Sequence, residues 1–169
     1  ALAAGWLEQM VDPVGGRAPN YGPNDGAQVL PLASCDYLDY RPTSQAARLF
    51  VDGRRVFEPG PWYEKALWLA GESALKAPEQ PLERPPVTAF ADGGYYILRG
   101  DHSWGMIRCH TYHDRPSQAD MLHFDLWYRG LNVLRDAGSY MYYCEEPWVD
   151  YFKSTAAHNT IEIDGQDQM

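Results

Sequence analysis

The chain has 169 residues, of which 45% are hydrophobic and 22% charged, so it is long enough for one folded domain or for parts of two. Its formal net charge of −9 argues against nucleic-acid binding through phosphate contacts, and no apolar run reaches the ~18 residues of a transmembrane helix. Three cysteines without a CxxC pair indicate neither a disulfide framework nor a thiolate zinc site.

The first part of the chain has the apolar periodicity of short helices. Residues 1–11 place Leu2, Trp6 and Met10 at four-residue spacing, and we predict a helix there. Further helices are predicted over 42–51 and 61–70, and a turn-rich loop over 20–26. Helices of this length are marginal alone, so we expect them to pack against other helices.

The pattern changes after a proline-rich segment. Residues 77–86 hold four prolines and predict a linker. Beyond it the hydrophobic period becomes two, which is typical of strands. Strands are expected over 87–91, 94–98, 105–111, 121–129, 132–135 and 160–163. Helices followed by antiparallel strands in separate segments predict the α+β class.

Polar residues of the kind found in active sites gather around the later strands. Arg115 could pair bidentately with a carboxylate, and His113 could serve as acid or base. Asp120 could be catalytic or could form a structural ion pair with Arg115. The alternation of a strand would place Asp120 on one face and His123 on the other, so we interpret His123 as a packed side chain.

Several motifs occur together in one order, and each is weak alone. They are DMLHFDLW at 120–127, DAGSY at 136–140, HNT at 158–160, Asp164-Gly165, NYGPNDG at 20–26 and DYRP at 39–42. Together they resemble the heparinase II/III-like polysaccharide lyases, in which an α/α toroid precedes an antiparallel β-sandwich.

The resemblance implies a domain plan. Residues 1–76 would be the C-terminal end of the α/α toroid, 77–86 the linker, and 87–169 the N-terminal part of the β-sandwich. The toroid would be incomplete, so we expect this chain to be an internal piece whose partner includes the remainder of the parent chain.

The resemblance also implies a metal site with an altered ligand. Family members often carry His-x-His-x-Asp where this chain has PSQAD at 116–120. The first His of that run is catalytic, and Pro116 stands in its place. The second His ligates a metal, so the implied ligands of a zinc or calcium ion are Gln118, Asp136 and His158. A Gln oxygen is a poorer zinc ligand than imidazole.

The function implied by the resemblance is β-elimination of an acidic, uronate-containing polysaccharide at a cleft between the helical and β domains, in the periplasm or outside the cell. Predicted catalytic residues are His113, Arg115 and Asp120; predicted substrate-binding residues are Asn20, Tyr21, Arg115 and Tyr140. Two other hypotheses remain open. Pro116 and Gln118 favour a non-catalytic exopolysaccharide-binding protein of the same fold, and a structural fragment without a site is the third.

Overall fold

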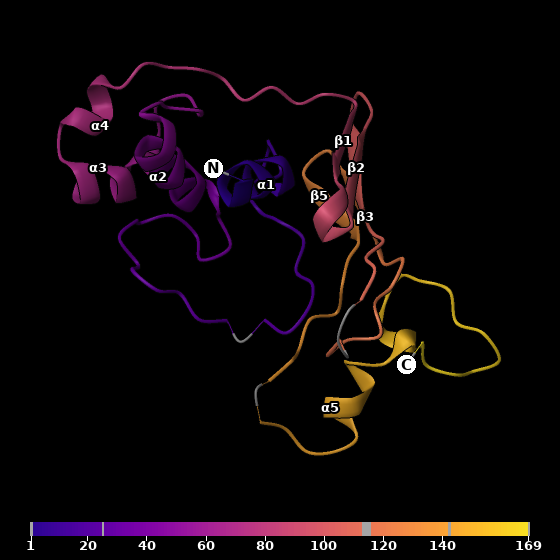
Figure 1. Cartoon of the computed structure of the whole chain (residues 1–169). Helices are drawn as coiled ribbons and strands as arrows, with labels where there is room; N and C mark the ends of the chain where they lie inside the picture. The colour runs from indigo at the N-terminus through magenta and orange to yellow at the C-terminus, as the bar shows by residue number, and fades with distance from the viewer. Residues whose placement is uncertain (1, 25, 113–115, 142, 169) are drawn as a thin grey trace. The chain divides into compact units, whose positions relative to one another are not determined.

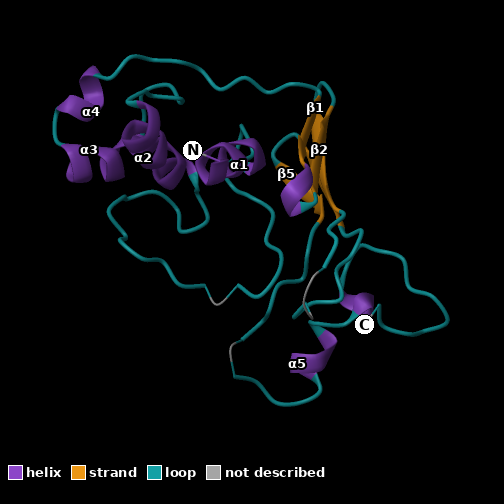
Figure 2. Ribbon diagram, viewed as in Figure 1, coloured by secondary structure: helices purple, strands orange, loops and turns teal. Residues whose placement is uncertain are grey.

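The computed structural model describes residues 2–24, 26–112, 116–141 and 143–168. The chain forms two compact units (Figure 1). The first, Ala1–Ala18 with Gln28–Arg84, is helical; the second, Pro19–Ala27 with Pro85–Met169, contains the sheet (Figure 2). Residues 19–27 therefore belong to the sheet unit, although in sequence they lie among the helices.

The helical unit is built from short helices. They are α1 (Leu2–Met10), α2 (Arg41–Asp52), the 3-10 turn η1 (Pro61–Tyr63), α3 (Glu64–Ala70) and α4 (Ser73–Lys76). Small side chains, Ala46, Ala66 and Ala74, form a core cluster that lets these helices approach closely. Glu8 of α1 is fully buried and is paired with Arg48 of α2, whose Nη2 lies 2.7 Å from its Oε2. No described helix is long and apolar enough to cross a membrane.

The sheet unit contains a five-stranded antiparallel meander. Its strands are β1 (Val87–Phe90), β2 (Tyr95–Arg99), β3 (Ser103–Arg108), β4 (Phe124–Tyr128) and β5 (Leu131–Leu134), and they pair in chain order. Ile97 and Met106 are fully buried, and Trp104 stacks on Trp127 at 5.4 Å between ring centroids. The α+β class predicted from sequence is confirmed. After the sheet come α5 (Trp148–Tyr151) and the 3-10 turn η3 (Thr155–Ala157).

Three predicted strands differ from the structure. The strand expected over 105–111 is β3, which ends at Arg108. The other two differ for local reasons. The strand expected over 121–129 begins only at Phe124, because Leu122 adopts a φ of 61° that no strand tolerates. The segment 160–163 is not a strand and forms one isolated bridge, Ile163 with Gln166. Asp164 and Gly165, with φ of 53° and 65°, turn the chain back there.

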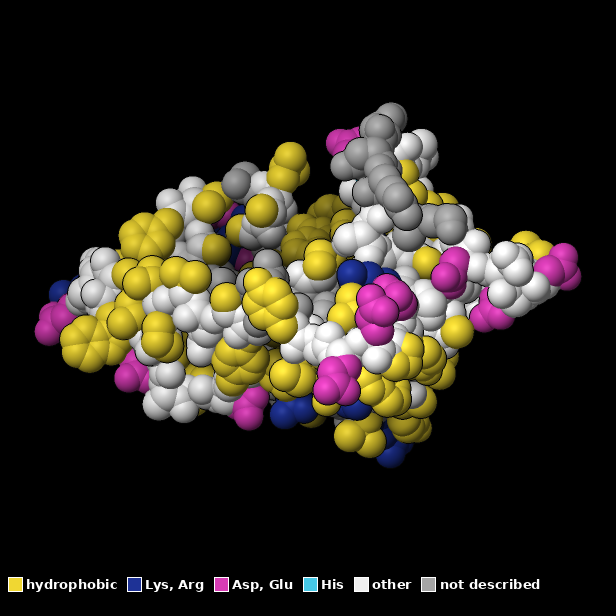
Figure 3. Space-filling view, turned by 90° about the horizontal axis from the view of Figure 1, so that it is seen from below, with side chains coloured by type: hydrophobic (Ala, Val, Ile, Leu, Met, Phe, Trp, Pro, Cys, Tyr) yellow, Lys and Arg dark blue, Asp and Glu magenta, His cyan; other side chains and the backbone are white. Residues whose placement is uncertain are grey.

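Large hydrophobic side chains remain exposed on the sheet unit. They include Leu131 and Val133 of β5 and Ile161 and Ile163 near the end of the chain. Hydrophobic side chains also cover much of the face seen in Figure 3. Apolar surface of this extent is typical of regions that contact another layer of protein or a ligand.

Gly94 closes the β1–β2 hairpin where another part of the backbone lies close, and this predicts a stability effect. Its φ is 70°, and a Cβ there would lie 2.4 Å from the Cys109 carbonyl oxygen. We expect Gly94→Ala to lower the free energy of unfolding by about 2–4 kcal/mol, combining left-handed strain with overpacking. Urea denaturation followed by circular dichroism measures this change.

Gly22→Ala is the matched control. Gly22 has nearly the same φ, 71°, but a Cβ there would meet nothing within 4 Å. Gly22→Ala should therefore lower the free energy of unfolding only through backbone strain, by about 1–2 kcal/mol. Equal losses for the two variants would mean that the close approach of Cys109 contributes nothing.

Candidate functional site

Three buried side chains, His123, Asp136 and His158, meet in the sheet unit. Their potential ligand atoms lie within 4.8 Å of one another. Nδ1 of His158 is 3.2 Å from Oδ2 of Asp136, and the two imidazole rings meet edge to face at 5.7 Å between centroids. Asp136 and His158 were predicted to share a site from the sequence, and the structure places them together.

The sheet brings these residues to one place. His123 directly precedes β4, and Asp136 follows the end of β5. These strands are antiparallel neighbours, so the start of one and the end of the other lie at the same edge. Asn159 fixes His158 there, because its side chain donates to the Arg135 carbonyl at 3.1 Å and its carbonyl accepts from Phe124 N at 3.0 Å.

Several polar atoms of this group are buried without a hydrogen-bond partner. They are Nε2 of His123, Oδ2 of Asp136 and both ring nitrogens of His158. Buried polar atoms are nearly always hydrogen-bonded, and leaving one unpaired costs about 1–3 kcal/mol. Imidazole nitrogens and a carboxylate oxygen together are the donor set of a catalytic zinc site, so the group fits a divalent transition metal.

His123 is held in one orientation by its other nitrogen. The backbone N–H of Asn159 donates to Nδ1 of His123 at 3.2 Å. This contact places the proton of the neutral ring on Nε2, which lies 4.0 Å from Oδ2 of Asp125. A metal can bind Nε2 only in the other tautomer of His123, in which the proton sits on Nδ1 and the hydrogen bond from Asn159 N–H is lost.

A second polar cluster surrounds Asp120, which is fully buried. Its Oδ2 is ion-paired with Arg108 Nη1, and its Oδ1 accepts a hydrogen bond from the Tyr112 hydroxyl at 3.0 Å. The rings of Tyr21 and Tyr112 lie 5.8 Å and 5.7 Å from the Arg108 guanidinium carbon. The structural ion pair considered for Asp120 therefore exists, with Arg108 as its cation.

The phenols of this cluster remain protonated at neutral pH. Burial, followed by the negative charge of Asp120, raises the pKa of Tyr112 to about 12. Burial, followed by the hydrogen bond with Tyr95, raises the pKa of Tyr21 well above its usual value. Tyr112 therefore keeps its proton at neutral pH, and it donates a hydrogen bond with that proton to Asp120.

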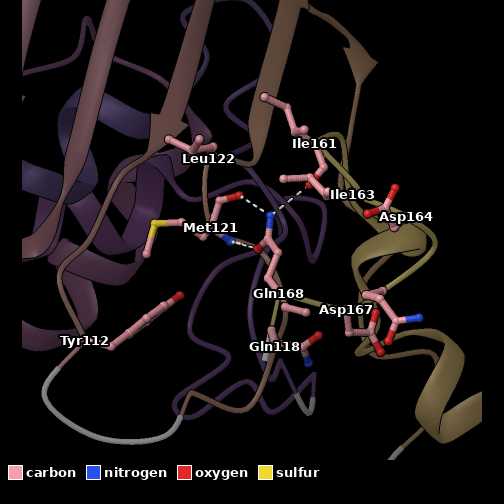
Figure 4. A pocket seen from close by; sticks show the side chains of 11 residues that line it. Tyr112, Gln118, Met121, Leu122, Ile161, Ile163, Asp164, Asp167 and Gln168 are labelled. Atoms are coloured by element: carbon pink, nitrogen blue, oxygen red, sulfur yellow. Dashed lines mark hydrogen bonds between the residues drawn. The ribbon is translucent and has the colours of Figure 1, made fainter.

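Gln118 lies at a pocket of about 580 Å³ beside this cluster (Figure 4). Gln118 is 5% exposed, and its Oε1 has no hydrogen-bond partner. Gln168, which also lines the pocket, exchanges two hydrogen bonds with the backbone of Met121, at 2.9 Å and 3.0 Å. The other lining residues are Tyr112, Ala119, Leu122, Ile161, Ile163, Asp164, Gln166 and Asp167. That Gln118 ligates a metal beside Asp136 stays a prediction.

The other described residues predicted for the site do not belong to the His123, Asp136 and His158 group. His113 and Arg115 lie outside the described residues. Asn20 and Tyr21 belong to the sheet unit, where the Tyr21 ring packs against Tyr95 at 5.5 Å between centroids. Tyr140 is 63% exposed and stacks on the Phe152 ring at 5.5 Å.

Sequence reasoning missed His123 as a member of the metal-binding group. It was interpreted as a packed histidine, and it is fully buried, but it packs against the two predicted ligands. Its position immediately before a strand, within the same motif as Asp120, was the available signal. The left-handed residue Leu122 made strand alternation an unsuitable guide to where it points.

The family model described as "Heparinase II/III-like, C-terminal" matches residues 83–169, just over half of the chain. No curated protein sequence matches the chain.

Three similar solved structures share the fold. "Crystal Structure of Heparinase III" has a TM-score of 0.63 and 17% identity, and the match covers 98% of this chain and 26% of that one. The heparan sulfate lyase HepC from Pedobacter heparinus has a TM-score of 0.58 and 16% identity, covering 94% and 23%. "Heparinase III-BT4657 gene product" has 0.58 and 16%, covering 96% and 23%.

The chain spans about a quarter of the length of these structures. At this level of identity their likeness concerns the fold, which agrees with the α+β architecture described above. The family match is independent of it and covers the whole sheet, the metal-binding group, and Arg108, Tyr112 and Asp120 of the second cluster. The chain therefore belongs to the heparinase II/III-like family.

Proposed function

We propose that this chain is part of a polysaccharide lyase that cleaves an acidic, uronate-containing polysaccharide by β-elimination. The observation that carries the proposal is the buried group of His123, Asp136 and His158 within a sheet domain of this family. Two similar structures are titled a heparinase and a heparan sulfate lyase, which supports an acidic polysaccharide as substrate. We place the protein in the periplasm or outside the cell, where such polymers occur.

β-Elimination on a uronate sets three chemical requirements. A base removes the proton from C5, a positive or hydrogen-bonding group stabilises the charge that spreads onto the C6 carboxylate, and an acid protonates the departing O4. A divalent ion held by Asp136, His158 and His123 would supply positive charge and Lewis acidity close to an anionic substrate.

In this scheme we assign the acid to Tyr112, whose hydroxyl has to turn from Asp120 Oδ1 to the departing O4. Its hydroxyl keeps its proton at neutral pH, and its side chain lines the pocket beside Gln118. His113 and Arg115 follow directly in the sequence, and they remain our candidates for the base and for the carboxylate-binding group. Both oxygens of Asp120 are already engaged, so we assign it the positioning of Arg108 and Tyr112.

Substrate binding draws on aromatic and amide side chains. The exposed ring of Tyr140, backed by Phe152, offers a flat surface on which a sugar ring can stack. We also retain Asn20 and Tyr21 as substrate-binding candidates. The buried, unpartnered Oε1 of Gln118 can accept a hydrogen bond from a sugar hydroxyl in the pocket.

The test is activity of the full-length parent protein on a panel of uronate-containing polysaccharides. We expect ultraviolet absorbance from a new C4–C5 double bond on at least one of them. Tyr112→Phe should lower the rate by about 10²-fold or more, because it removes the proton donor. Tyr128→Phe, which changes a half-exposed phenol on β4, is the control and should leave the rate unchanged.

Two results would contradict the proposal. One is a folded protein that gives no unsaturated product on any polymer of the panel. Binding without turnover would then identify a non-catalytic polysaccharide-binding protein. The other, directed at Tyr112 alone, is a Tyr112→Phe variant with an undiminished rate.

A further inference from the structure

The segment Pro19–Ala27, here called the docking loop, is hydrogen-bonded to the turn that carries Asp136. The backbone N–H of Asn24 donates to the Ser139 hydroxyl at 3.2 Å, and that hydroxyl donates to the Gly22 carbonyl at 3.2 Å. Within the loop, Asn24 Nδ2 donates to Asn20 Oδ1 at 2.8 Å. One hydroxyl thus connects the turn to two points of the loop, Gly22 and Asn24.

The docking loop also covers Gly138 closely. A Cβ at Gly138 would lie 2.6 Å from Asn20 Nδ2, so the Asn20 amide occupies the space where other residues carry a side chain. Gly138 has a φ of 76°, which glycine adopts readily. Its N–H donates to Asp136 Oδ1 at 2.7 Å. The loop therefore lies directly against the peptide that orients the Asp136 carboxylate.

A second attachment holds the loop to the sheet. The Tyr21 ring packs against Tyr95, the first residue of β2, at 5.5 Å between centroids. It also lies beside the Arg108 guanidinium of β3. The loop is therefore fixed at the sheet by Tyr21 and at the Asp136 turn by Asn20, Gly22 and Asn24.

We propose that the docking loop is a positioning element for Asp136, acting through Ser139 and Gly138, and that it sets the metal affinity of the site. The inference rests on the metal site of the proposed function. Asp136 lies beyond the end of β5, so no ladder hydrogen bonds hold it. With Oδ1 bound to Gly138 N, the other oxygen is directed to within 3.2 Å of His158. Loss of a contact that orients a metal ligand typically lowers metal affinity by about 10–100-fold.

The test uses the full-length protein and the variant Ser139→Ala, which removes both hydrogen bonds to the loop. Co²⁺ is the probe, because its visible absorption reports ligand geometry. We expect the Co²⁺ dissociation constant to rise about 10–100-fold and the absorption band to weaken or shift. Without metal, the Gly138 amide should exchange with deuterium faster, while the melting temperature of the protein changes little.

Two further variants separate positioning from a general loss of structure. Ser139→Thr keeps the hydroxyl and should restore both the affinity and the spectrum. Ser73→Ala removes a comparable hydrogen bond in the helical unit, from Ser73 Oγ to the Ala70 carbonyl at 2.6 Å, and should change neither.

Failure of this inference is distinguishable from failure of the metal site. If wild-type protein binds Co²⁺ and Ser139→Ala binds it with the same affinity and spectrum, the positioning role is overturned. If wild-type protein binds no Co²⁺, the metal site fails and with it the role in metal affinity. The exchange rate of the Gly138 amide then decides whether the loop holds the turn, and an unchanged rate overturns that as well.

Discussion

His158→Ala should reduce the affinity of the protein for Zn²⁺ by about 10²–10³-fold. Both ring nitrogens of His158 are buried without a hydrogen-bond partner, and Nδ1 lies 3.2 Å from Oδ2 of Asp136. Structural zinc sites gain about 10–16 kcal/mol from four ligands, so one ligand is worth roughly 2.5–4 kcal/mol. Titration calorimetry or competition with a chromophoric chelator measures the loss. His102→Ala, which changes an exposed histidine in the same unit, is the control.

Binding of Zn²⁺ at this site should also raise the stability of the protein. A buried nitrogen without a partner costs about 1–3 kcal/mol, so without an ion the group lowers stability. Excess Zn²⁺ at 100 times its dissociation constant should raise the free energy of unfolding of the wild type by about 2.7 kcal/mol, and that of His158→Ala by much less. Equal Zn²⁺ affinities in the two proteins would show that His158 is not a ligand.

The fold could be predicted largely because its signals are local. Alternation of apolar residues marked β1 and β2 to within one residue. The ends of the strands were harder to predict. A single residue in the left-handed region can end a strand, and its amino-acid type need not show this. Leu122 is the clearest example, because a leucine gives no sequence signal for its φ of 61°.

The site could be predicted only in part, and the reason is the distance along the chain between its members. Asp136 and His158 stood out through the family resemblance. His123 did not, because the parity argument assumed a continuous strand through Leu122. An ion pair between Asp120 and Arg115 was considered, and Arg115 lies outside the described residues. The structure pairs Asp120 with Arg108, which lies at the end of β3.

The docking loop shows a further limit of sequence reasoning. Its turn-forming residues were recognised, and Asn20 and Tyr21 were named as candidates. Residues 19–27 lie between two helices in the sequence, and composition alone gave no reason to assign them to the sheet unit. Their contacts with Ser139 and Tyr95 span more than 70 residues and depend on tertiary structure.

Asp120→Ala should lower the free energy of unfolding by about 3–5 kcal/mol, because it leaves the half-buried Arg108 guanidinium without its anion. It also leaves the Tyr112 hydroxyl without its acceptor. Urea denaturation measures the loss. The control is Asp36→Ala, which breaks an exposed pair with Arg17 whose side chains are 64% and 52% exposed, and it should cost about 1 kcal/mol or less.

The conservative variant Asp120→Asn separates a positioning role from a catalytic one. The amide oxygen can still accept from Tyr112, but the charge that pairs with Arg108 is gone. If Asp120 positions its neighbours, Asp120→Asn should lose stability and lyase activity together, and replacing both partners, Arg108→Met with Asp120→Leu, should recover stability but not activity. If instead Asp120→Asn keeps full stability and loses only turnover, Asp120 contacts the substrate. The catalytic role predicted from the sequence then holds, and the burial of its carboxylate has to be relieved when substrate binds.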